Sequence, residues 1–296
     1  MLIRIGFEII VACQAPVPML MALSTHPEFG GKIIGADKVR SSGYGPVTEY
    51  IDGYGNRISR TVAGPGFTTF WSDSVAEIEG LPDQIPYGAM QHRVEDLPYQ
   101  TLNFLTASRY CDSDRLVDFA WKQFGNVPEG WERVQAISTF VHTHVTFGYK
   151  FGRPDKTAAN VFGEKTGVCR DFAHLGLSLC RAMNIPARYA SGYLPDVGEP
   201  DSGFDDFCAW FEVFLGGQWH TVDARYNRPR IGRILMVRGT DASDVAMITS
   251  FGNYELTSFR VWSTELPTGT TDADIGVLLQ ALPAPREKGP NFGPIN

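Results

Sequence analysis

The periodicity of the apolar residues changes twice along the chain, and this change constrains the fold more than any other feature. Residues 1 to about 97 alternate apolar and polar side chains in short runs separated by turn-forming residues, which is typical of β-strands. From about 110 to 183 the apolar residues recur at helical spacing, and strand-like runs return afterwards. This order of strands, helices and a further set of antiparallel strands predicts an α+β protein.

Length and composition agree with two domains. The 296 residues correspond to about two domains at roughly 150 residues each. The 31 glycines and 19 prolines exceed the average share and favour a structure with many turns. We predict an all-β N-terminal domain over residues 1–97, expected to be a sandwich, and an α+β domain over 98–265. Residues 81–98 are predicted to be a linker, and residues 266–296 a C-terminal extension whose last dozen residues form a loose tail.

Charge and hydropathy exclude several classes of protein. Lys and Arg total 26 and Asp and Glu total 33, so the net charge of −7 argues against nucleic-acid or anionic-membrane partners. No apolar run reaches the length of about 18 residues that a membrane span needs. Residues 10–13 resemble a lipoprotein cleavage site, but the preceding segment is short and carries Glu8. We therefore predict an edge or half-buried strand there, and a cytoplasmic protein.

Four helices are predicted in the second domain. The first begins at Asp112 or Ser113, the second after Pro128, the third after Thr157, and the fourth spans about 169–183. The first is expected to bury an apolar face made of Leu116, Val117, Ala120, Trp121 and Phe124.

The five cysteines are an odd number, which excludes a complete internal disulfide framework and favours a functional thiol in a reduced compartment. Cys169 begins the fourth predicted helix and lies on its inward face, opposite a polar stripe of Arg170, His174, Ser178 and Arg181. The N-terminus of a helix favours a thiolate, and its free N–H groups can stabilise an oxyanion. Alternatively, Cys169 is a small buried apolar residue, as we expect of Cys180, and spacing alone favours that interpretation.

Residues 207–215 and 218–225 predict a β-hairpin joined by a two-residue Gly-Gly turn. In that register Leu215 pairs with Gln218, and Cys208 and Asp223 become diagonal neighbours on one face. His220 lies on the other face. The face that carries Cys208 is predicted to contain Cys208, Trp210, Glu212, Phe214, Trp219, Thr221, Asp223 and Arg225.

Several motifs in order resemble the bacterial transglutaminase-like superfamily, whose members are often described as cysteine proteases. They are Gly-Val-Cys-Arg-Asp-Phe-Ala-His over 167–174, the segments 181–189 and 191–194, Ala-Trp-Phe-Glu-Val over 209–213, Trp219, and Val-Asp-Ala-Arg over 222–225. The resemblance covers about residues 100–265, and the β-rich N-terminal part is similar to the region that accompanies this domain. It implies a papain-like core of helices packed on an antiparallel sheet.

The resemblance also implies a Cys-His-Asp triad that attacks peptide or isopeptide amide bonds. By motif position Cys169 is the nucleophile and Asp223 the orienting carboxylate. The triad histidine belongs immediately before Ala209, where this chain has Cys208. The implied substrate is a peptide or protein amide. The acyl group forms a thioester with the cysteine and is then hydrolysed or transferred to an amine. Neither a cofactor nor a metal is implied.

Cys208 is a poor replacement for histidine, because a thiol with a pKa of about 8.5 holds its proton at pH 7 whereas an imidazole at about 6.5 releases it. Losing the base would cost about 10²–10⁴-fold in rate. Three hypotheses stay open. Another histidine acts instead (His220, His174, His142 or His144), or the chain is a catalytically degenerate protein that binds a peptide or ligand. In the third, Cys169 and Cys208 form a redox pair or, with Asp223, a metal site that lacks an evident fourth ligand.

Two further expectations concern charged residues. Glu212 is expected to be a partner of the site or to form an ion pair with Arg225. The four arginines between 225 and 233 are expected to form a salt-bridged surface. Tyr149 and Tyr193 are expected to serve packing rather than oxyanion binding.

Overall fold

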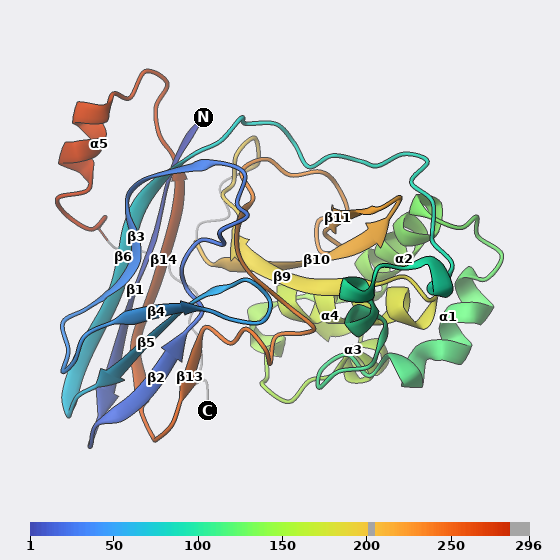
Figure 1. Cartoon of the computed structure of the whole chain (residues 1–296), viewed down its shortest axis with the longest axis horizontal. Helices are drawn as coiled ribbons and strands as arrows, with labels where there is room; N and C mark the ends of the chain where they lie inside the picture. The colour runs from blue at the N-terminus through green and yellow to red at the C-terminus, as the bar shows by residue number, and fades with distance from the viewer. Residues whose placement is uncertain (201–204, 285–296) are drawn as a thin grey trace.

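A computed structural model describes residues 1–200 and 205–284 of the chain. The β-strands near the N-terminus form one side of the molecule, and the helices with a second group of strands form the other (Figure 1). The predicted tail over the last dozen residues lies outside the described part. None of the helices in the described part has the length and apolar character that a membrane span requires.

Two four-stranded antiparallel sheets make up the N-terminal side. The first has the strand order β14 (Glu255–Glu265), β1 (Leu2–Cys13), β6 (Gly66–Glu77) and β3 (Lys32–Ser41). The second has the order β13 (Ile248–Ser250), β2 (Val17–Met21), β5 (Arg57–Ala63) and β4 (Thr48–Ile51). Alternate residues of β1, such as Phe7 and Ile9, are fully buried and share one core with Met19 and Met21 of β2.

The structure corrects two expectations about this side. β1 is not an edge strand, since it lies between β14 and β6 and is buried along most of its length. β13 and β14, which the predicted division placed in the second domain, pair with β2 and β1 of the first. A pairing between strands some 250 residues apart leaves no local signal, because the alternation within β14 does not identify its neighbour.

The other side packs four α-helices around a third sheet. The helices are α1 (Val117–Phe124), α2 (Trp131–His144), α3 (Ala158–Glu164) and α4 (Cys169–Ala182), and short 3₁₀ turns are η1 (Val94–Asp96), η2 (Tyr99–Leu105), η3 (Ser113–Leu116) and η4 (Tyr149–Phe151). The sheet has the order β11 (Gln218–Val222), β10 (Phe207–Leu215), β9 (Ala187–Tyr193) and β12 (Ile234–Gly239), all antiparallel. β7 (Thr146–Phe147) and β8 (Thr166–Gly167) form a short parallel pair, and α5 (Asp272–Leu278) lies in the C-terminal extension.

The α+β prediction and the four helices are confirmed. The Thr157 hydroxyl caps α3 by accepting a hydrogen bond from the backbone N–H of Asn160. The predicted apolar face of the first helix is wrong at two positions. Val117 and Trp121, which lie one helical turn apart, are 38% and 46% exposed, whereas Ala120 and Phe124 of the same helix are buried.

α4 is buried along nearly its whole length, and this fixes the position of its first residue. At Gly176 an added Cβ would lie 2.5 Å from the ring of Phe211 on β10, so glycine permits the close contact of helix and sheet. Three residues of the polar stripe of α4 are also buried: His174, Ser178 and Arg181. Arg181 donates hydrogen bonds to the carbonyl oxygens of Ala187, Thr106 and Thr240, which compensates for the burial of its charge.

The two sides contact each other at the start of β10 and through the linker. Phe207, the first residue of β10, packs against Phe7 of β1 and Phe259 of β14, with ring centres 6.3 and 6.0 Å apart. The linker is held against the second side rather than free, since the Asp83 carboxylate accepts hydrogen bonds from Arg233 and from the backbone N–H of Arg230.

A buried ion pair ties the first sheet together and gives a test of the fold. Asp73 on β6 accepts hydrogen bonds from Arg4 on β1 at 2.9 and 2.6 Å and from the Trp262 indole on β14 at 2.9 Å. We expect Asp73→Asn to lower the free energy of unfolding by about 3 kcal/mol, because it leaves the Arg4 charge buried without its counter-ion. Urea unfolding measures this change.

The matched control is Glu77→Gln in the same strand. Glu77 pairs with Lys32 at 3.7 Å, and both side chains are largely exposed. The control should cost less than about 1 kcal/mol. Equal losses in the two variants would show that the buried pair has no special role.

Candidate active site

Cys169 is the first residue of α4, and the segment before it is rigidly held. The fully buried Asp171 carboxylate accepts a hydrogen bond from the backbone N–H of Val168 at 3.0 Å and pairs with Arg170 at 3.1 Å. A Cβ at Gly167 would lie 2.6 Å from the Asp171 side chain, so only glycine fits there. The first N–H groups of α4 have no acceptor within the helix, and together with the helix dipole they favour negative charge at this end.

Neighbouring groups stabilise a negative charge on the half-buried Cys169 sulfur. The Cys208 thiol donates a hydrogen bond to it, the Arg225 guanidinium lies nearby, and the backbone N–H of Ala209 also donates. These groups lower the pKa of Cys169 to about 6, against the opposing effects of burial and of Asp171. Cys169 is therefore largely a thiolate at pH 7 without a histidine.

Cys208 has the opposite character. It is the second residue of β10, is buried, and holds its proton because the hydrogen bond to Cys169 and burial raise its pKa well above the ordinary value. Its sulfur also lies 3.7 Å from the carbonyl oxygen of Ala209. Neither cysteine is in a disulfide. The pair is thus one thiolate and one thiol.

The hairpin register is confirmed as far as Val222, which pairs with Phe211, while Leu215 pairs with Gln218. The prediction that the strand continues to Arg225 is wrong. Asp223 accepts hydrogen bonds from the backbone N–H groups of Arg225 and Tyr226 at 3.0 and 3.2 Å, and the chain turns away from β10.

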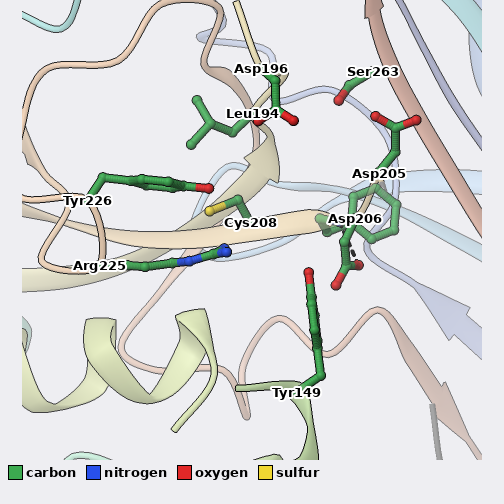
Figure 2. Close-up of a pocket in the computed structure, with 10 residues that line it drawn as sticks. Tyr149, Leu194, Asp196, Asp205, Asp206, Cys208, Arg225, Tyr226 and Ser263 are labelled. Carbon is green, nitrogen blue, oxygen red and sulfur yellow. Dashed lines mark hydrogen bonds between the residues drawn. The ribbon is translucent and has the colours of Figure 1, made fainter. Parts of the chain in front are cut away.

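This turn aims the Arg225 guanidinium toward the Cys208 sulfur, as Figure 2 shows. The guanidinium also stacks 3.7 Å from the centre of the Phe147 ring. Arg225 therefore reaches the cleft from a turn, and not from a position opposite Cys208 in the β10–β11 ladder.

Asp223 is occupied by groups other than a histidine. Its second oxygen lies 3.1 Å from a guanidinium nitrogen of Arg233, which is buried and also pairs with Asp83. Arg233 is thus the partner of this carboxylate, whereas the resemblance implies an imidazole partner. The buried Asp223 side chain thus supports the turn that carries Arg225.

Two expectations about charged residues are wrong. Glu212 pairs with Arg188 and Arg238 at 2.6 and 2.9 Å, and not with Arg225. The arginines of the 225–233 run are not a surface set, because Arg230 and Arg233 are enclosed by aromatic rings and carboxylates. Sequence spacing identified the charges but could not show that the loop folds back under the sheet.

All six histidines lie in the described residues, and the four weighed as substitute bases make their hydrogen bonds elsewhere. His142 donates to the carbonyl oxygen of Arg225, His144 to that of Phe162, and His220 to that of Leu215. The fully buried His174 accepts from the N–H of Ala242, and burial lowers its pKa to about 3. None of these hydrogen bonds brings an imidazole to Cys169.

A small cleft with a volume of about 40 Å³ is lined by Cys208, and Cys169 is not among the residues that line it. Figure 2 shows the Cys208 sulfur, the Arg225 guanidinium and the Tyr149 hydroxyl directed toward it. Ser263 of β14 also borders the cleft, so the first sheet contributes to its wall. The residues that line it are Tyr149, Leu194, Asp196, Asp205, Asp206, Phe207, Cys208, Arg225, Tyr226 and Ser263.

Asp206 is a site residue that the sequence analysis missed. Burial of its carboxyl, together with the negative charge on Cys169, raises its pKa to about 8, although the N–H of Phe207 donates to it at 2.7 Å and Arg225 is near. It is therefore mostly a neutral acid at pH 7. The signal that could have found it is its spacing of two from Cys208, which places both on one face of an extended segment.

The structure also bears on the metal hypothesis for Cys169, Cys208 and Asp223. Within residues 1–200 and 205–284, no group of three or more histidine, cysteine, aspartate or glutamate side chains is arranged so that it could hold a metal ion.

The role of Cys208 in holding the thiolate can be tested by substitution. We expect Cys208→Ala to raise the midpoint of Cys169 alkylation from about pH 6 toward the ordinary cysteine value of about 8.5, because the strongest hydrogen bond to the thiolate is lost. Cys208→Ser, which keeps a donor, should raise it less. Iodoacetamide labelling read site by site by mass spectrometry gives the midpoints, and an unchanged midpoint in both variants would contradict this role.

Comparisons with known proteins identify the superfamily of this chain. A sequence profile of the Transglutaminase-like superfamily matches residues 118–224, which contain Cys169, Cys208 and Asp223. The chain is 30% identical to a candidate cysteine protease from Cytophaga hutchinsonii, whose crystal structure superposes with a TM-score of 0.78 over 92% of each chain.

Shorter matches occur to mycobacterial proteins. One is 46% identical over 59 residues to an uncharacterized protein of Mycobacterium leprae, and another is 32% identical over 114 residues to one of Mycobacterium tuberculosis. These matches span 20% and 36% of the length of those relatives. The near full-length similarity to the Cytophaga hutchinsonii structure, together with the matching profile, shows that this chain belongs to the transglutaminase-like superfamily.

Proposed function

We propose that the protein is a thiol enzyme that acts on peptide or isopeptide amide bonds through a thioester on Cys169. The observation that carries this proposal is the stabilised charge on the Cys169 sulfur at the start of α4. In a histidine-dependent site the imidazole removes the thiol proton. Here that step is unnecessary in most molecules at pH 7, because Cys208, Arg225 and the N–H of Ala209 already hold the thiolate.

The first chemical step is attack of the Cys169 thiolate on the amide carbonyl carbon. The negative charge moves to the carbonyl oxygen, where the N–H groups at the start of α4 can stabilise it. When the tetrahedral intermediate collapses, the carbon–nitrogen bond breaks and the departing amine requires a proton. A poor leaving group of this kind makes the proton donor essential.

Asp206 is suited to donate that proton. It lines the same cleft as Cys208 and Arg225, and its pKa of about 8 keeps the carboxyl mostly protonated at pH 7. After donation the carboxylate can take a proton back from the water or amine that attacks the thioester. Cys208 is less suited, because its proton stabilises the thiolate and its pKa is raised well above the ordinary value.

The leaving group provides a direct test of this division of roles. We expect Asp206→Asn to lower the rate on an acyl anilide about 10²–10⁴-fold, since the departing amine loses its acid. Acylation by the p-nitrophenyl ester of the same acyl group should change little, because p-nitrophenolate leaves without a proton. Release of p-nitroaniline and the burst of p-nitrophenolate measure the two reactions.

The matched control is Asp118→Asn, which changes an exposed aspartate on α1. It should leave both reactions unchanged. Equal losses on the ester and the anilide in Asp206→Asn would contradict the role of Asp206. A wild-type protein whose Cys169 is not acylated by the ester at all would favour the catalytically degenerate, ligand-binding hypothesis instead.

The raised pKa of Asp206 also predicts a pH-dependent effect on stability. An aspartate ionises at about 3.9 in the unfolded chain and about 8 in the folded one, so the wild type loses stability as the pH rises between these values. Asp206→Asn lacks this loss. Its Tm should therefore exceed that of the wild type by an amount that grows between about pH 4 and pH 8.

Differential scanning calorimetry at several pH values follows this difference. Asp118→Asn, compared in the same way, should show no comparable growth. A Tm difference for Asp206→Asn that stays constant with pH would contradict the burial of an ionisable carboxyl at this position.

A further inference from the structure

We propose that Cys169 and Cys208 form a peroxide-reactive dithiol, in which Cys169 attacks a small hydroperoxide and Cys208 then closes a reversible disulfide. This activity needs the two sulfurs but not the acyl chemistry proposed above. It uses the residue that stands where the superfamily resemblance places a histidine.

The contact between the two sulfurs is the first observation. A side-chain hydrogen bond between Cys208 and Cys169 is the largest influence on the pKa of each, and both cysteines are free. A disulfide bond is about 2.05 Å long, so the two sulfurs must move together from hydrogen-bond distance to form it. The two residues come from α4 and β10, which pack directly against each other.

The division of charge between the sulfurs is the second observation. Cys169 is half-buried and carries the stabilised thiolate, whereas Cys208 is buried and keeps its proton. Thiolate character with solvent access, next to a second cysteine that can resolve the oxidised form, distinguishes redox-active cysteines from inert ones. Arg225, Asp206 and Tyr149 face the pair from the turn after β11, from the start of β10 and from η4, and Asp171 lies behind it on α4.

The size of the cleft is the third observation. Its volume of about 40 Å³ is enough for two or three water molecules, and thus for hydrogen peroxide. Its lining combines a guanidinium, carboxyl groups and a tyrosine hydroxyl with the Cys208 sulfur, so a small polar oxidant would find hydrogen-bond partners there (Figure 2).

The chemistry balances with groups in the cleft and one equivalent of peroxide. The Cys169 thiolate attacks one peroxide oxygen, the oxygen–oxygen bond breaks, and the leaving hydroxide takes the Asp206 proton to become water. This step leaves Cys169 as a sulfenic acid. Cys208 then attacks the Cys169 sulfur, its thiol proton leaves with the hydroxyl as a second water, and the disulfide forms. A dithiol reductant restores both thiols by exchange.

The experiment uses the full chain, reduced and then treated with one equivalent of hydrogen peroxide at pH 6. The thiols that remain are alkylated, and digestion without reductant locates any disulfide. We expect a single linkage between the peptides that carry Cys169 and Cys208. The buried Cys13, Cys111 and Cys180 serve as internal controls that stay alkylatable after unfolding, since burial raises the pKa of each.

The rate provides a second readout. At pH 6 about half of Cys169 is thiolate, against about 0.3% of a free cysteine with a pKa of about 8.5. The weaker nucleophilicity of a low-pKa thiolate offsets roughly a tenfold part of this advantage. Cys169 should therefore react about tenfold faster than free cysteine at this pH. A rate no faster than free cysteine would overturn the proposal.

Variants separate the two roles. In Cys208→Ser the sulfenic acid on Cys169 should persist and be trapped by dimedone, because no thiol resolves it. Cys13→Ala, which removes a thiol outside the site, should behave like the wild type, and far-ultraviolet circular dichroism checks that each variant is folded. Random pairing of the five cysteines, or identical products from the wild type and Cys208→Ser, would overturn the proposal.

The outcome is distinguishable from that of the proposed acyl chemistry. A protein that forms the Cys169–Cys208 disulfide but is not acylated by the p-nitrophenyl ester retains this inference and loses the proposed function. A protein that is acylated but does not form the disulfide retains the proposed function and loses this inference.

Discussion

A negative charge on the Cys169 sulfur is the interaction on which the rest of the site depends. Three elements far apart in sequence hold it: the first turn of α4, the start of β10 through Cys208 and Ala209, and the turn after β11 through Arg225. Each of these elements is held by contacts with other parts of the fold, and Arg225 is held by stacking on the Phe147 ring. α4 is buried against β10, and the Phe207 ring at the start of β10 packs on β1 and β14 of the first sheet. The N-terminal side thus helps to position a chemistry to which it contributes no nucleophile.

Cys208 occupies the position where the superfamily resemblance implies a histidine, and the charges of the site are arranged without an imidazole. Asp223, which the superfamily resemblance pairs with an imidazole, neutralises Arg233 and supports the turn that carries Arg225. Two groups hold protons in place of an imidazole. Cys208 holds one beside the thiolate, and Asp206 holds another at the cleft. In a histidine-dependent site, a thiol and an imidazole supply the nucleophile and the proton donor. Here a thiolate and a neutral carboxylic acid are arranged for the same two roles.

Local patterns predicted much of this fold. Capping residues and helical spacing located the four helices, and the Gly216-Gly217 turn fixed the register of the hairpin through Val222. The position of Cys169 at a helix N-terminus followed from the same reasoning. These features depend on residues close in sequence, where propensity and periodicity are informative.

Features that depend on distant contacts could not be predicted in this way. The pairing of β14 with β1 joins strands at opposite ends of the chain, and the burial of Arg233 depends on Asp83 from the linker. The acidity of Asp206 arises from enclosure and from the Cys169 charge, neither of which is visible in its neighbours along the chain. The alternation of side chains along a strand also predicted the wrong backbone position for Arg225. The turn at Asp223 ends the strand three residues before Arg225.

The most direct test of the central claim is a spectroscopic titration of the thiolate itself. The ultraviolet absorbance of the wild type minus that of Cys169→Ala isolates the ionisation of this sulfur without any reagent in the cleft. A thiolate that appears with a midpoint near pH 6 would agree with the stabilisation described above. A midpoint at the ordinary cysteine value of about 8.5 would contradict it.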